Sequence, residues 1–235
     1  MFERKDIQKL KDEYINYTSY NLPEINSIIY ENTNDYLGQT INQEICNGIY
    51  NIYLSNSLNE HSEKFQKAIL FHEFTHINDL LQIFSLTEPE IEAIMLTYSE
   101  AHAEAIKLRY LLNIDLKRKI NQGVRYVEDV NGKLDLGTIS ARYLNTSLEY
   151  YKKFKQEKNP EYFKKYIYHF CHYCGYLTIR IPKDTDKLLN GVLEKFPPLN
   201  QNKLKELYYA IESKNLHKCY ALYMELKLIA MQETI

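Results

Sequence analysis

Glycine and proline are scarce in this chain, and their scarcity is the feature that most restricts its fold. The 235 residues include only 7 Gly and 6 Pro, the residues that most often interrupt helices and form turns. We therefore expect long helices joined by short connections. Apolar residues recur at helical spacing over most of the chain. The helices that this spacing predicts cover residues 3–18, 62–84, 87–112, 138–157, 160–179, 184–195, 200–213 and 216–231.

One region near the beginning of the chain has a different pattern. Residues 27–30, 38–41 and 48–54 are short runs rich in β-branched or aromatic residues, and Asn, Asp and Gly separate them. Such runs predict a small antiparallel sheet of three strands. The predicted fold class is therefore α+β and mainly helical, with this sheet packed on a pair of long helices and followed by a C-terminal helical half.

Composition excludes several classes of protein. Lys+Arg is 29 and Asp+Glu is 31, which gives a net charge of -2, whereas general nucleic-acid binders usually carry a basic excess. No apolar run approaches the roughly 18–20 residues that a membrane span needs. Four cysteines are too few for a disulfide scaffold in a chain of this size. We therefore expect a cytoplasmic protein without a membrane partner.

The predicted helix 62–84 contains the sequence His-Glu-Phe-Thr-His at residues 72–76. Two histidines four residues apart lie on one face of a helix, so both imidazoles can bind one metal ion. Glu73 is poorly placed to bind that ion, but it can reach a water molecule on it and act as a base. Chance would produce this motif about 0.02 times in a chain of this composition. The alternative is a buried helix whose histidines hydrogen-bond to the backbone.

A catalytic zinc site needs a third protein ligand and an open position. If the helices 62–84 and 87–112 form a hairpin, Glu100 returns level with the histidine pair, at about 18 Å from the turn. By the same measure Glu92 lies too close to the turn and Glu104 one turn too far. Glu104 shares a helix face with Glu100, and we expect it to accept a hydrogen bond from a ligand histidine.

These motifs resemble the gluzincin branch of zinc metallopeptidases, in which a downstream glutamate is the third ligand. The matching residues are His-Glu-Phe-Thr-His and, 24 residues after His76, Glu-Ala-His-Ala-Glu at 100–104. The small sheet resembles the minimal gluzincin core of ImmA/IrrE-type proteins from phages and mobile elements. The resemblance covers roughly residues 26–112. It implies Zn²⁺ held by His72, His76 and Glu100, with Glu73 as general base and Glu104 supporting a ligand.

Two positions depart from the gluzincin pattern. Asn78 stands where an apolar residue usually follows the motif, and Glu104 stands where an aspartate is commoner. On this resemblance, residues 1–114 form the metal-binding core. Residues 115–235 form a helical half that completes the cleft, either as part of one continuous domain or as a second one.

We therefore predict a zinc metallopeptidase, a hydrolase in which metal-activated water attacks a peptide bond of a peptide or protein substrate with Glu73 as base. One alternative is a non-catalytic metal-binding protein with a regulatory or interaction role on the same core. Glu73 counts against this alternative, because a pure scaffold needs the two histidines but no base. A zinc hydrolase of a non-peptide amide is the other alternative.

The helical half adds further candidate residues. His169, His172, Arg180 and several tyrosines are candidates for stabilising an oxyanion opposite the metal. Cys171 and Cys174 are spaced i, i+3 in a predicted helix. This spacing favours buried free thiols over a second zinc site. His102 is expected to face away from Glu100 and Glu104.

Overall fold

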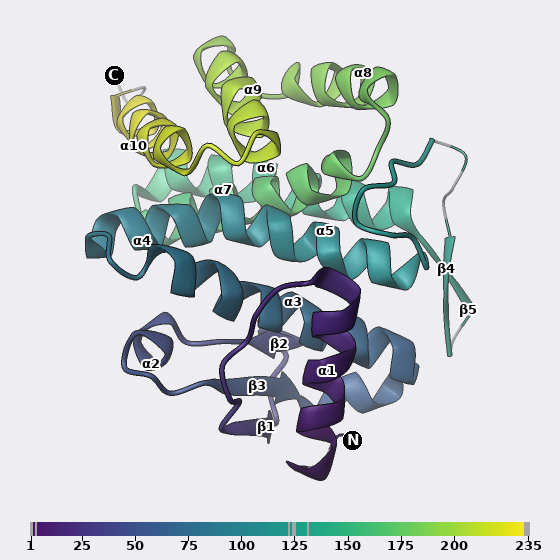
Figure 1. The fold of residues 1–235 in the computed structure, drawn as a ribbon. Helices are drawn as coiled ribbons and strands as arrows, with labels where there is room; N and C mark the ends of the chain where they lie inside the picture. Colours follow the sequence, from purple (N-terminus) through teal and green to yellow (C-terminus); the bar gives the residue numbers. More distant parts are fainter. Residues whose placement is uncertain (1, 3, 122, 124–125, 131, 233–235) are drawn as a thin grey trace. The chain divides into compact units, whose positions relative to one another are not determined.

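The computed structural model describes residues 2, 4–121, 123, 126–130 and 132–232 and shows a mainly helical α+β protein (Figure 1). This confirms the predicted fold class. The chain forms two compact units that alternate along the sequence. The first comprises Met1–Thr87, Ile106–Arg118 and Val127–Leu134, and the second comprises Glu88–Ala105, Lys119–Tyr126 and Asp135–Ile235.

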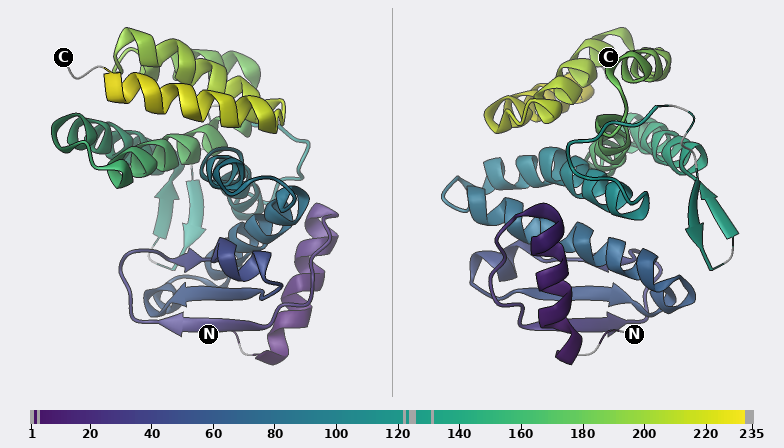
Figure 2. Two further views of the ribbon diagram at one scale, coloured as in Figure 1. Left: turned by 90° about the vertical axis from the view of Figure 1, so that its left-hand side faces the viewer. Right: turned by 45° about the vertical axis from the view of Figure 1, so that its right-hand side comes forward.

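The first unit contains a sheet of three strands in the order β1-β3-β2. The strands are β1 (Ser27–Glu31), β2 (Gly38–Gln39) and β3 (Asn51–Ser55). β2 pairs with β3 antiparallel, as predicted, whereas β1 pairs with β3 in parallel, so that the prediction was wrong for this pair. The arrows of β1 and β3 point the same way in Figure 2.

The segment between β1 and β3 explains the parallel pairing. It contains β2 and the short helix α2 (Asn42–Cys46). Parallel neighbours need a crossover of about a dozen residues or more, and residues 32–50 supply it. A local run of β-forming residues predicts that a strand exists, but not the direction in which it pairs.

Helix α3 (Glu63–Ile83) is the most deeply buried element of the first unit, with every residue from Ala68 to Leu80 buried. It follows the 3₁₀ turn η2 (Asn56–Glu60) and begins after Ser62, whose hydroxyl accepts a hydrogen bond from the Phe65 N–H. Helix α1 (Ile7–Thr18), preceded by the turn η1 (Arg4–Asp6), also belongs to this unit. The helices predicted over 3–18 and 62–84 are thus confirmed.

Tyr14 fastens α1 to α3. Its ring lies edge-on to Phe71 and Phe74, at centroid distances of 5.2 and 5.4 Å. Its hydroxyl lies 3.0 Å from the Thr75 hydroxyl, which donates to the Phe71 carbonyl. Because aromatic edge-to-face contacts and a buried hydrogen bond meet at one residue, α3 is held in a defined orientation.

A hairpin of β4 (Tyr126–Asp129) and β5 (Gly132–Asp135) was not predicted. The Asn131-Gly132 dipeptide is a hairpin signal that the helical pattern around it obscured. Asp129 Oδ1 accepts a hydrogen bond from the Ser62 N–H at 2.8 Å, and Asp129 Oδ2 lies 2.8 Å from His61 Nδ1. The hairpin therefore supports the first turn of α3.

The second unit is helical. Its elements are α4 (Glu88–Ile94), the π-helical segment η3 (Met95–Ser99), the first residues of α5 (Glu100–Leu111), α6 (Leu136–Glu157), α7 (Pro160–Thr178), α8 (Pro182–Leu193), α9 (Pro198–Glu212) and α10 (Leu216–Gln232). Prolines occupy the first turns of α7, α8 and α9, where a missing N–H costs nothing. α6 and α7 lie side by side (Figure 2).

The five helices predicted between residues 138 and 231 are confirmed with small shifts of their ends. The predicted helix 87–112 occurs as α4, η3 and α5, with a π-helical turn in place of a regular one. Within the described residues, no helix combines the length and apolar character that a membrane crossing requires.

Candidate metal centre

Helix α3 of the first unit carries His72, Glu73 and His76 on its buried middle turns. The Nε2 atoms of the two histidines lie 3.0 Å apart, and the rings meet edge-on with centroids 4.6 Å apart. The histidines are 7% and 6% exposed, and Glu73 is 3% exposed. Two imidazole nitrogens directed to one place on a buried helix are a pair of donors that suits a single metal ion.

Glu73 lies against the backbone of strand β2. A Cβ atom placed on Gly38 would be 2.9 Å from Glu73 Oε1 and 2.7 Å from Ile69 Cγ2. Any larger residue would displace one of these side chains, so glycine permits the strand to approach the carboxylate. β2 is an outer strand in the order β1-β3-β2.

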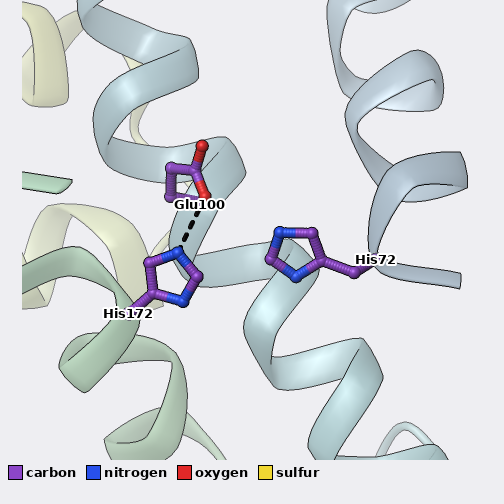
Figure 3. A group of neighbouring side chains, drawn as sticks. All are labelled: His72, Glu100 and His172. Carbon is purple, nitrogen blue, oxygen red and sulfur yellow. Dashed lines mark ion pairs between the residues drawn. The ribbon is translucent and has the colours of Figure 1, made fainter. Parts of the chain in front are cut away.

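The second unit brings His172 of α7 to two glutamates of α5. His172 Nε2 lies 3.1 Å from Glu100 Oε2, the ion pair drawn in Figure 3. Its Nδ1 lies 3.0 Å from Glu104 Oε2, and the Tyr143 hydroxyl of α6 donates to Glu104 Oε1 at 3.4 Å. The His172 and Glu104 side chains are 5% and 0% exposed, and that of Glu100 is 14% exposed.

The two carboxylates shift the pKa of His172. Burial lowers the pKa of its imidazole, but the contacts with Glu100 and Glu104 outweigh burial and raise the pKa above its ordinary value. The two carboxylates therefore favour the protonated form of the His172 imidazole.

His72 in the first unit, and Glu100 with His172 in the second, are side chains that could serve as metal ligands (Figure 3). His72 and Glu100 belong to the predicted ligand set, and His172 does not. A metal ion is compatible with these side chains, without an indication of which metal.

From the sequence, His172 is one of several candidates for oxyanion stabilisation and is not a predicted partner of Glu100 or Glu104. A signal for its contacts was nevertheless present, because Glu100 and Glu104 share one helix face and a buried carboxylate such as that of Glu104 needs a hydrogen-bonding or cationic partner. Which of the histidines supplies it depends on the packing of α7 on α5, and a local pattern does not reveal that packing.

The other candidates have partners of their own. His169 stacks on Tyr150, and burial, with the nearby His172, lowers its pKa to about 4. Arg180 donates to the Asn121 carbonyl at 2.7 Å, and its guanidinium lies 4.6 Å from the Tyr176 ring centroid.

The remaining candidates lie in packed surroundings. The His102 ring packs against Tyr98, with a centroid distance of 5.3 Å. Cys171, Cys174 and Cys219 are buried free thiols, and burial raises the pKa of Cys219 to about 12.

No protein-family model, curated protein or solved structure matches this chain.

Proposed function

We propose that this protein is a zinc-dependent peptidase whose metal is held by His72, His76 and Glu100. The observation that carries the proposal is the motif on α3, where two histidine Nε2 atoms lie 3.0 Å apart and a buried glutamate stands next in the sequence. Two imidazoles and one carboxylate are a ligand set of catalytic zinc sites. Glu100 is the proposed third ligand because of its spacing after the motif, and its carboxylate is a suitable zinc ligand.

Glu73 is the proposed proton carrier. When bound, zinc would lower the pKa of a water molecule to about 7. The Glu73 carboxylate accepts a proton from the attacking water and passes it to the amine that leaves the peptide bond. The order His-Glu-His supports this role, because a site that only stores metal has no use for a base beside its ligands.

The position of β2 supports a peptide substrate. Its backbone reaches Glu73 at Gly38, and the strand lies on the outside of its sheet. An extended peptide can bind to such a strand by forming main-chain hydrogen bonds. We place the reaction in the cytosol, since all four cysteines are free thiols.

A second candidate is a non-catalytic, metal-binding regulatory protein. The position of His172, with its Nε2 atom 3.1 Å from Glu100 Oε2, favours it, because His172 is a potential further ligand. If His172 joined His72, His76 and Glu100 as a fourth ligand, no position would be left for water, and four-coordinate sites of that kind are structural.

The Glu73→Gln variant separates the two candidates. A peptidase keeps its zinc in this variant but loses hydrolysis of a peptide library, because an amide does not accept the proton. Glu63→Gln is the matched control, since Glu63 lies on the same helix with a 73% exposed side chain. The peptidase proposal is supported if wild type and Glu63→Gln cleave peptides and Glu73→Gln does not. Zinc binding without cleavage by any of the three supports the regulatory protein.

A further inference from the structure

Helix α7 approaches the beginning of α5 unusually closely at Gly175. A Cβ atom on Gly175 would lie 2.5 Å from the Ala101 carbonyl oxygen and 2.7 Å from Glu104 Cβ. No side-chain Cβ atom can be placed at these distances without a shift of its neighbours, and the Ala101 oxygen belongs to a helix backbone, which cannot move easily. Glycine at this position therefore permits the backbones of two buried helices to touch.

The close approach places His172, one turn before Gly175, between two acidic side chains. Glu100 and Glu104 are separated by one turn of α5, so they lie on one face. His172 contacts one of them with each ring nitrogen, at 3.1 and 3.0 Å. The hydrogen bond from Nδ1 to Glu104 orients the ring, and its Nε2 then faces Glu100 Oε2 as an ion pair.

Tyr143 of α6 contacts both Glu104 and His172. The Tyr143 hydroxyl donates to Glu104 Oε1, and the Tyr143 and His172 rings pack with centroids 4.8 Å apart. Along the chain, the π-helical segment η3 ends at Ser99, directly before Glu100. π-helical turns occur frequently at functional sites.

We propose that His172 is a positioning residue that orients the Glu100 carboxylate for metal binding, with Glu104 and Tyr143 fixing the imidazole. The proposal rests on the proposed function in one respect, since it takes Glu100 as a metal ligand. The chain of contacts Tyr143–Glu104–His172–Glu100 lies wholly within the second unit. Outer partners of this kind typically change metal affinity by 10–100-fold when they are removed.

Two replacements of His172 separate its two contacts. The amide nitrogen of asparagine can take the place of Nδ1 and keep the contact with Glu104, whereas that of glutamine can take the place of Nε2 and keep the contact with Glu100. We expect His172→Asn to bind zinc about 10–100-fold more weakly in a chelator competition. We expect His172→Gln to retain affinity closer to wild type. His102→Asn is the control and should bind zinc as wild type does.

Cobalt separates a positioning residue from a ligand. The visible absorption of protein-bound Co²⁺ reports its ligands, so the spectrum of His172→Asn at saturating Co²⁺ should equal that of wild type. A changed spectrum would overturn the proposal, because His172 would then be a ligand. Equal zinc affinities of wild type and His172→Asn would overturn it too.

Failure of the proposed function can be told apart from failure of this inference. Equal zinc binding by wild type and His76→Ala would refute the proposed metal site, whatever the role of His172. Measurements on the metal-free protein then test the role of His172 separately. The contact between His172 and Glu100 is then tested by the melting temperatures of Glu100→Gln, His172→Asn and the double variant. A double variant that melts with the lower of the two single variants supports the coupling, and additive shifts overturn it.

Discussion

Replacing Gly38 with alanine tests the close approach of strand β2 to Glu73. The added methyl carbon would lie 2.7 Å from Ile69 Cγ2 and 2.9 Å from Glu73 Oε1. Carbon atoms in contact normally stay about 3.5–4.0 Å apart, so the methyl group overlaps Ile69 by about 1 Å. Overpacking of this kind typically costs about 1–3 kcal/mol. At roughly 2–4 °C per kcal/mol for a chain of this size, a cost of about 2 kcal/mol lowers the melting temperature by about 4–8 °C.

Differential scanning calorimetry of the zinc-free protein measures this shift. Gly191→Ala in α8 is the matched control, because an added Cβ there meets no atom within 4 Å. Alanine in a helix interior is about 0.5–1 kcal/mol more stable than glycine, so the control should melt at or above the wild-type temperature. A Gly38→Ala variant that melts with wild type would refute the close packing of β2 on Glu73.

Three further changes have expected outcomes. Tyr14→Phe should destabilise the fold by about 1 kcal/mol. Thr75→Val should destabilise it by more, about 1–3 kcal/mol, because the valine leaves the buried Tyr14 hydroxyl without its partner. Urea unfolding of both variants measures the two free energies. Burial raises the pKa of Asp129, but its hydrogen bonds outweigh burial and lower the pKa to about 2. Its stabilisation, about 1–2 kcal/mol, should therefore be present above about pH 4 and vanish towards pH 2. The melting temperature of Asp129→Asn should lack this pH dependence. Gly175→Ala should destabilise the protein more than Gly38→Ala does, because the added methyl group would meet the Ala101 oxygen, a backbone atom. The melting temperatures of the two variants test this order.

The sequence was sufficient to predict the helices because their signals are local. Apolar periodicity identified α3 and the five helices predicted between residues 138 and 231. The position of the His72–Glu73–His76 motif within a buried helix followed from the same pattern. Each of these features depends on residues within a few turns of one another.

Features that depend on distant residues were not predicted. The parallel pairing of β1 with β3 depends on the path of residues 32–50, and the contact of His172 with Glu100 depends on the packing of α7 against α5. The hairpin of β4 and β5 is different. Its turn signal was local, but ten residues with alternating character are a weak pattern between long helices.

Zinc content tests most directly whether His72 and His76 hold a metal ion. Wild type and His76→Ala would be purified in parallel, loaded with zinc, passed through a desalting column and analysed by mass spectrometry for metal per chain. His102→Asn serves as the control for the loss of a histidine elsewhere. We expect about one zinc per chain in wild type and His102→Asn and almost none in His76→Ala, because losing one of the three ligands removes much of the binding free energy. Equal zinc content in wild type and His76→Ala would contradict this expectation.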